Sequence, residues 1–137
     1  MTIIGIDPHS AKPHSVAIMR DNAWIVKDMY LGEISREVAS WKPDLVAIED
    51  QYMMRHVGLK SLIQATGQLQ GLCILFDTKY IMVNPAVWRS FFGLSKVDKA
   101  NRSVLYRKEA VKHCNLKVSE DQAVAIMLCV YASRVST

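Results

Sequence analysis

The chain has 137 residues, of which half are hydrophobic and 22% are charged, a balance typical of one globular domain with a full core. It contains no run of about 18 apolar residues, which excludes a membrane-spanning helix. Seventeen Lys and Arg residues against thirteen Asp and Glu residues give a net charge of +4, which favours an anionic partner only weakly.

The three cysteines, Cys73, Cys114 and Cys129, are far apart and show neither CxxC nor Cys/His spacing. This pattern is typical of free thiols in a reducing compartment and not of disulfides or a zinc site. The first predicted strand begins directly at the N-terminus, where it leaves no room for a secretory signal. We therefore expect a cytoplasmic protein whose residues 1–137 form a single domain.

The first predicted strand starts at Ile3 and runs into a single carboxylate, Asp7, before it breaks at Pro8. Two further strands, Ser15 to Met19 and Trp24 to Leu31, follow after short turn-rich connections. Strands joined by such short connections pair with their neighbours in sequence. The three together predict an antiparallel meander.

A helix and a fourth strand follow the meander. Ile34, Val38 and Trp41 lie at helical spacing in a short predicted helix from Glu33, and Pro43 ends it. An apolar strand from Leu45 to Ile48 then terminates at Glu49 and Asp50. A strand, a helix and another strand predict a right-handed crossover, which places the fourth strand parallel to the first.

The longest predicted helix runs from Leu59 to Phe76, and its Gly67 and Gly71 would allow another element to pack closely against it. A last short strand covers Tyr80 to Val83. We therefore expect an α/β fold with a five-stranded mixed sheet flanked by helices. Strands one to three form the antiparallel meander, and strands four and five run parallel to strand one.

Basic residues gather between residues 89 and 112, where the acids are Asp98 and Glu109. The basic side chains are Arg89, Lys96, Lys99, Arg102, Arg107, Lys108 and Lys112. Residues 98–113 predict a basic amphipathic helix, which is either a surface for an anionic partner or simply a solvated helix face. Its candidates for inward-facing positions are Val104, Ala110 and Val111.

The final predicted helix, from Ser119 to Arg134, is apolar almost all round and should be buried. Ser119 and Gln122 have the spacing of a capping box, which fixes where this helix begins. Two acids, Glu120 and Asp121, therefore lie in its first turn.

Carboxylates thus end two of the predicted strands and open the last predicted helix. If the first and fourth strands are parallel neighbours, Asp7 and Glu49 lie within a few ångströms of each other at the same edge of the sheet. Ionising several crowded carboxylates costs much free energy unless a cation lies between them. Hard oxygen ligands of this kind favour Mg²⁺ or Mn²⁺. Taken singly, Glu49 could be a surface turn residue, and Asp121 could be a helix N-terminal charge favoured by the dipole.

Four segments in order resemble the RuvC family of Holliday junction resolvases, within the RNase H-like superfamily. They are GIDP at 5–8, VAIEDQY at 46–52, PAVWRSFFG at 85–93 and EDQAVAIML at 120–128. The resemblance implies a homodimeric, metal-dependent endonuclease that nicks two strands symmetrically at a four-way junction. It implies Mg²⁺ as cofactor, with Mn²⁺ able to substitute, and branched DNA as partner.

The resemblance also assigns roles. Asp7 and Glu49 match the first and second metal ligands, and Asp121, supported by Glu120, supplies a third. Lys99 resembles a lysine near the scissile phosphate. The remaining residues implied to bind DNA are Tyr52, by base stacking, and Arg55, Arg89, Lys96 and Arg102. The helix from Leu59 to Phe76 resembles the family's dimer interface.

The chain departs from the family pattern at two positions. His9 stands where the family usually has Gly; we expect it to tolerate a left-handed backbone and to face solvent, with an approach to phosphate as the alternative. Val124 stands where the last helix normally carries its final aspartate, three residues after Asp121. In another register Asp121 takes that later place and Val118 the earlier one. In either register one ligand is absent, and Glu120 points about 100° away from Asp121 around the helix.

These residues support a leading hypothesis and a second one. The first is a junction-resolving endonuclease that uses Asp7, Glu49, Asp121 and Lys99. The second is a branched-DNA-binding protein of the same fold that cuts weakly or not at all. A nucleotide-binding relative resembling the sugar kinases is disfavoured, because the chain is short and lacks a Gly-rich phosphate loop, so we expect no nucleotide cofactor.

Overall fold

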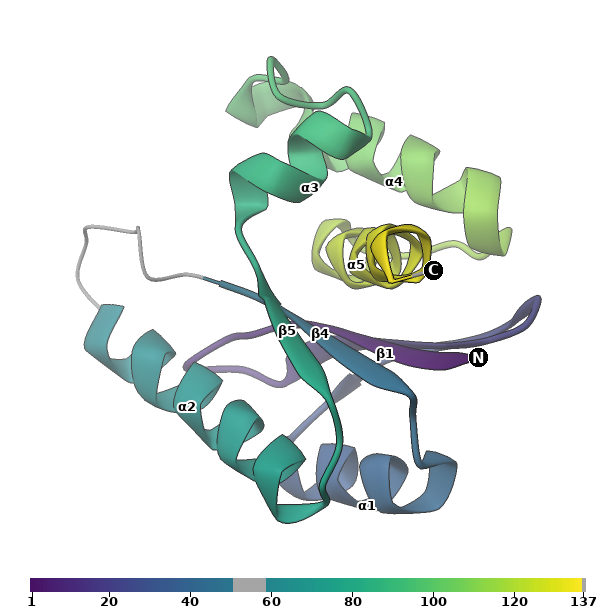
Figure 1. The fold of residues 1–137 in the computed structure, drawn as a ribbon. Helices are drawn as coiled ribbons and strands as arrows, with labels where there is room; N and C mark the ends of the chain where they lie inside the picture. Colours follow the sequence, from purple (N-terminus) through teal and green to yellow (C-terminus); the bar gives the residue numbers. More distant parts are fainter. Residues whose placement is uncertain (51–58, 137) are drawn as a thin grey trace.

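A computed structural model describes residues 1–50 and 59–136 of the chain. Its centre is a five-stranded sheet in the order β3-β2-β1-β4-β5 (Figure 1). The strands are β1 (Thr2–Asp7), β2 (His14–Arg20), β3 (Ala23–Met29), β4 (Leu45–Glu49) and β5 (Tyr80–Val83). β1, β2 and β3 pair antiparallel, whereas β4 pairs parallel with both β1 and β5. The predicted number and directions of the strands are confirmed.

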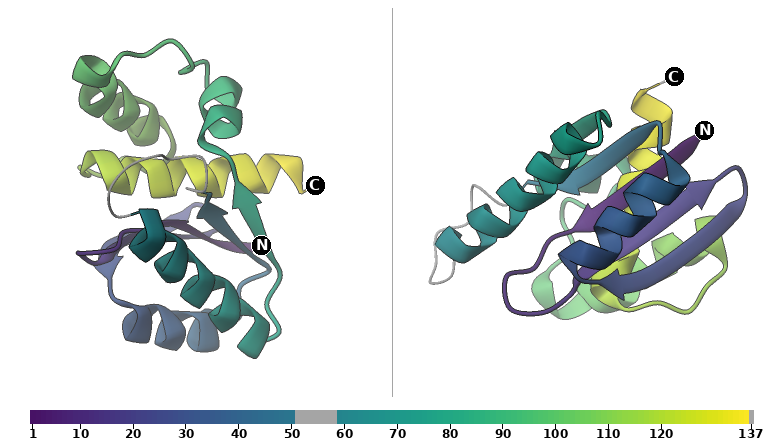
Figure 2. Two further views of the ribbon diagram at one scale, coloured as in Figure 1. Left: turned by 90° about the vertical axis from the view of Figure 1, so that its left-hand side faces the viewer. Right: turned by 90° about the horizontal axis from the view of Figure 1, so that it is seen from below.

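Helices cover both faces of this sheet (Figures 1 and 2). They are α1 (Leu31–Trp41), α2 (Leu59–Leu75), α3 (Pro85–Phe91), the short 3₁₀ helix η1 (Lys99–Asn101), α4 (Arg102–Cys114) and α5 (Glu120–Val135). α1 and α2 lie on one face, and α5 lies on the other with α3 and α4 outside it. Each face has its own hydrophobic core, and β1, at the centre, contributes to both. None of the described helices is long and apolar enough to cross a membrane.

The close packing of α5 on β1 depends on Gly5. A Cβ atom added there would collide with the carbonyl oxygen of Ala125 and would lie 2.9 Å from the Sγ of Cys129. The absence of a side chain at Gly5 therefore lets the helix backbone rest directly on the strand. Cys129 itself is buried, and its thiol lies 3.3 Å from the carbonyl oxygen of Ala17 in β2.

Several predicted boundaries shift because side chains cap helices earlier than expected. The third strand ends at Met29, not at Leu31, because Tyr30 is the N-cap of α1 and shares a capping box with Glu33. The capping box of Ser119 and Gln122 is confirmed, and it places Ser119 just before α5.

The basic helix predicted over residues 98–113 is two pieces, η1 and α4, because Asp98 caps the first turn through the backbone of Asn101. Its buried face is formed by Tyr106 and Ala110. Val104 and Val111, predicted to point inward, are 60% and 44% exposed, and that part of the prediction is wrong. The Tyr106 ring instead packs edge-on against Trp88 of α3, at 5.3 Å.

Two glycines of α2 have no described residue packed against them. Gly67 and Gly71 are exposed, and a Cβ atom added at either would meet nothing within 4 Å among the described residues. The close approach that these glycines allow is thus not used within the described fold. The three cysteines are free thiols, as predicted, and burial raises the pKa of the Cys73 thiol to about 11.

Candidate active site

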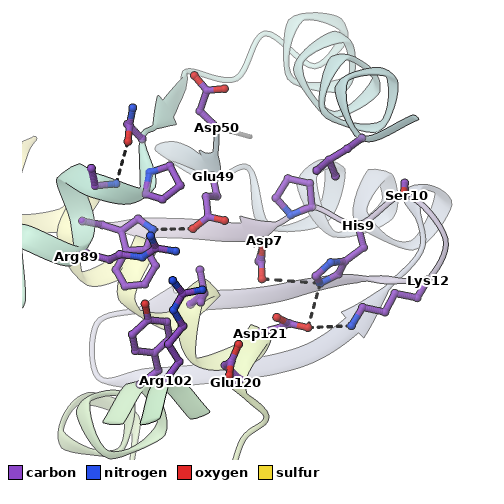
Figure 3. A pocket seen from close by; sticks show the side chains of 18 of the residues that line it. Asp7, His9, Ser10, Lys12, Glu49, Asp50, Arg89, Arg102, Glu120 and Asp121 are labelled. Carbon is purple, nitrogen blue, oxygen red and sulfur yellow. Dashed lines mark hydrogen bonds and ion pairs between the residues drawn. The ribbon is translucent and has the colours of Figure 1, made fainter. Parts of the chain in front are cut away.

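Asp7 and Glu49 lie side by side because β1 and β4 are parallel. Ile6 pairs with Ile48 in the register of these strands, so the next residue of each strand emerges at the same edge of the sheet. Both carboxylates are buried, with 5% and 6% of their surface exposed. The indole Nε1 of Trp88, on α3, donates a 2.7 Å hydrogen bond to Oε2 of Glu49, which fixes the direction of this carboxylate (Figure 3).

Asp121 reaches the same edge of the sheet from α5, which covers one face of the sheet. It lies in the first turn of α5, and the close packing of α5 on Gly5 directs this turn toward the end of β1. Its Oδ2 accepts a 2.9 Å hydrogen bond from Lys12 Nζ, in the β1–β2 connection. The carboxylates of β1, β4 and α5 therefore converge (Figure 3).

His9 joins this cluster, which contradicts the prediction that it faces solvent. Only 15% of its side chain is exposed, and its Nε2 lies 3.8 Å from Oδ2 of Asp7 and 3.6 Å from Oδ2 of Asp121. Its backbone N–H donates to Nδ1 of His14, at 3.0 Å, and its own backbone is not left-handed. The turn therefore needs no glycine, and the imidazole folds inward.

The crowding changes the protonation of the cluster. Burial raises the pKa of Asp7 well above its usual value, and the negative charges of Glu49 and Asp121 raise it further. Burial also lowers the pKa of His9, which favours a neutral imidazole with a free lone pair. An ionised Asp7 thus requires a positive charge beside it.

The cluster fits a divalent cation. Ligand atoms of Asp7, His9 and Asp121 all lie within 4.8 Å of one another. Carboxylate oxygens and imidazole nitrogens are both established ligands of first-row divalent metals. Glu49, on the far side of Asp7, extends the set of carboxylates along the pocket (Figure 3).

An open pocket of about 730 Å³ contains these groups, and its opposite wall is basic. Arg89 and Arg102 line this wall together with Tyr106, which is 2% exposed. The Nε atoms of both arginines and the Tyr106 hydroxyl are buried without a hydrogen-bond partner among the described residues. Trp88 supports the wall, because Tyr106 packs edge-on against its indole at 5.3 Å and Arg89 lies over it at 5.5 Å. Buried donors without partners are costly, so this wall is suited to an anion.

The other predicted residues are distributed as follows. Glu120 lines the pocket beside Asp121, whereas Lys96 and Lys99 are exposed and are not among its lining residues. Tyr52 and Arg55 lie outside the described residues.

Val124 lines the pocket one helical turn after Asp121 and is 6% exposed. Val118 precedes α5 and is not among the lining residues. The pocket wall formed by α5 therefore carries the apolar side chain of Val124 three residues after Asp121.

The sequence predictions include no site role for four residues of the pocket. They place His9 in solvent, and they assign nothing to Lys12, Trp88 or Tyr106. The available signal for the first two was the density of polar groups in PHSAKPHS, directly after Asp7. Tyr106 gave no such signal, since an aromatic residue in an amphipathic helix is equally suited to the core.

No family model matches the sequence. Among solved structures, T. thermophilus RuvC in complex with a Holliday junction substrate is similar at a TM-score of 0.73 and 13% identity, over 100% of this chain and 98% of that one. Another Thermus thermophilus RuvC structure gives 0.70 and 15%, with the same coverage. The Fowlpox virus resolvase in complex with Holliday junction DNA gives 0.60 and 17%, over 97% of this chain and 99% of that one. The RuvC-like, RNase H-like fold implied by the sequence resemblance is thereby confirmed.

Proposed function

We propose that this protein is a divalent-metal-dependent endonuclease that resolves four-way and related branched DNA by paired nicks. The observation that carries the proposal is the convergence of Asp7, Glu49 and Asp121 from three separate elements onto one pocket. A buried, crowded carboxylate such as Asp7 destabilises the fold unless a cation offsets its charge, so a functional reason for it is required. The fold supports the same conclusion, since similar structures are junction resolvases bound to their substrate.

Bound divalent metal, Mg²⁺ or Mn²⁺, would supply activation of a water molecule and stabilisation of the leaving oxygen of a phosphodiester. Asp7, Glu49 and Asp121 would hold it, with Glu120 nearby. The contribution of Trp88 is positional, because its hydrogen bond to Oε2 fixes the direction of the Glu49 carboxylate. Preorganised ligands of this kind need little rearrangement during the reaction.

The basic wall would hold the DNA backbone. Arg89 and Arg102 present guanidinium groups that match the oxygens of a phosphate, and the Tyr106 hydroxyl adds a neutral donor between α3 and α4. Lys96 and Lys99 are exposed between α3 and α4, where they would add positive charge for more distant phosphates. Tyr52 and Arg55 keep their proposed roles in stacking on bases and in backbone contact.

Paired nicking requires two active sites, and we propose a homodimer formed through α2. The helix exposes Ile63, Gly67, Gly71 and Ile74, which are spaced by three or four residues and so share one face. The two glycines would let a second helix approach closely, since no described residue of the chain packs against them. The proposed dimer predicts that Gly71→Arg converts a dimer into a monomer in light-scattering measurements.

The alternative is a protein that binds branched DNA without cutting it, and the observation that favours it is the apolar Val124 in the pocket. The two are separated by Glu49→Gln, because Gln can still accept the hydrogen bond from Trp88 while it removes the negative charge. A labelled four-way junction and a linear duplex of the same sequence are incubated with wild type and variant in Mg²⁺ and Mn²⁺. We expect symmetric nicks only with the wild type and the junction, with gel retardation unchanged in the variant. Retarded but intact junction with the wild type in both metals would establish the alternative, and undiminished nicking by the variant would refute the site.

A further inference from the structure

We propose that His9 is a direct nitrogen ligand of the catalytic divalent metal, and that it supplies the donor that Val124 does not. The inference rests on the metal-dependent function proposed above. It carries a second consequence, which is that the site prefers Mn²⁺ or Co²⁺ over Mg²⁺.

The position of the imidazole supports direct coordination. Two ligands bound to one cation at about 2.1 Å lie about 3 Å apart when adjacent and about 4.2 Å apart when opposite. The separations from His9 Nε2 to the carboxylates, 3.8 Å for Asp7 and 3.6 Å for Asp121, fall between these values. Both exceed the length of a hydrogen bond, so these contacts are not an ordinary imidazole–carboxylate bond.

The turn holds His9 in this direction. Its backbone N–H donates to Nδ1 of the buried His14, at the start of β2. The hydroxyl of Ser15 lies 3.4 Å from the same Nε2, a weak contact that steers the ring, and Ser15 is itself bonded to Asp28 at 3.3 Å. A ring anchored from its backbone and its edge needs only a small shift to bind a metal.

One group competes with the metal. Lys12 Nζ lies 2.9 Å from Oδ2 of Asp121, the same oxygen that His9 approaches. The Lys12 side chain is 60% exposed, so it can withdraw into solvent at modest cost when a cation binds. It therefore offsets the charge of Asp121 without closing the site.

His9 would replace the metal ligand that Val124 cannot provide. On α5, Asp121 and Val124 are three residues apart and both line the pocket, but valine offers no donor atom. His9 approaches from the opposite side, out of the β1–β2 connection, and completes a group of three potential ligands with Asp7 and Asp121. The number of donors is thus kept, while one oxygen becomes a nitrogen. Imidazole nitrogen suits the borderline transition metals better than Mg²⁺, which takes oxygen ligands and retains its water.

The test uses the full chain loaded with Mn²⁺ and measured by pulsed electron paramagnetic resonance. We expect a directly coordinated ¹⁴N in the wild type, which changes to ¹⁵N when histidine alone is isotopically labelled. This measurement on the unmutated chain does not depend on any variant folding. His9→Ala should lose the nitrogen signal, whereas His113→Gln should keep it. His113 is a suitable control because it also lies beside a carboxylate, Glu109, at 3.5 Å but does not line the pocket.

Calorimetric titration of the same proteins supplies the second readout. His9→Ala should weaken Mn²⁺ binding about tenfold or more, and Mg²⁺ binding by less. Val124→Asp in the His9→Ala background should restore most of the Mn²⁺ affinity without any nitrogen coupling. Mn²⁺ bound to the wild type with no nitrogen coupling, or with coupling that persists in His9→Ala, would overturn this inference alone. Failure of the wild type to bind Mn²⁺ or Mg²⁺ at all would overturn the proposed function with it.

Discussion

Replacing Gly5 by alanine should separate α5 from the sheet and so displace Asp121 from Asp7. The added Cβ would collide with the Ala125 carbonyl oxygen and lie 2.9 Å from Cys129 Sγ and 3.2 Å from the Cys129 backbone nitrogen. Backbone atoms of a buried helix cannot rotate away, so the strain should fall at the upper end of the usual cost of overpacking, about 3 kcal/mol. For a chain of this size that corresponds to a fall in Tm of about 10 °C.

The same substitution at Gly32 is the matched control. Gly32 lies exposed in the first turn of α1, and a Cβ atom there would meet nothing within 4 Å. Gly32→Ala should therefore leave the free energy of unfolding unchanged or raise it by up to about 1 kcal/mol, with Tm unchanged or slightly higher. Thermal unfolding followed by circular dichroism and Mn²⁺ titration are measured on both variants. If Gly5→Ala unfolds and binds metal like the wild type, the close packing at Gly5 does not position Asp121.

Three further predictions concern the pocket. Tyr106→Phe keeps the ring that packs on Trp88 but removes a buried hydroxyl that has no hydrogen-bond partner among the described residues. Tm should therefore hold or rise slightly, while junction affinity measured by gel retardation falls several-fold. Unchanged affinity would show that Tyr106 is not part of the basic wall that binds the DNA. Lys12→Met should raise Mn²⁺ affinity by roughly two- to fivefold in calorimetry, because an exposed competing charge is lost, and a decrease would show that Lys12 supports the site instead. In metal-free protein the raised pKa of Asp7 means that its protonation stabilises the fold below its ordinary pKa of 3.8, and this stabilisation is lost as the pH rises through the raised value. The difference in Tm between Asp7→Asn and the wild type should accordingly grow in favour of the variant as the pH rises above 3.8, and a flat difference would contradict the raised pKa.

The sheet could be predicted because its strands are apolar runs and because turn residues or a helix separate them along the chain. Turn residues separate β1, β2 and β3, and the helix before β4 forces a parallel crossover, which leaves one arrangement for these four strands. The nearness of Asp7 and Glu49 follows from that arrangement alone. These features depend on local chain direction, and local direction is what periodicity and turns encode.

The remainder of the site depends on contacts that no periodicity encodes. The turn that carries His9 is held by the hydrogen bond from its backbone N–H to Nδ1 of His14, and an isolated turn gives no sign of that bond. The burial of Tyr106 in place of Val104 depends on the position of α3 over α4, which is a tertiary relation. The outward face of Gly67 likewise becomes visible only when its neighbours are known.

Whether Asp7 anchors a metal site that cuts DNA is tested by single-turnover cleavage of a labelled four-way junction in Mn²⁺ by Asp7→Asn. Asparagine keeps the size of the side chain and removes the charge that the site requires. We expect the wild type to nick the junction. We expect the variant to be folded, at least as stable as the wild type without metal, and slower in cleavage by about a hundredfold or more. Cleavage by Asp7→Asn at the rate of the wild type would contradict this expectation.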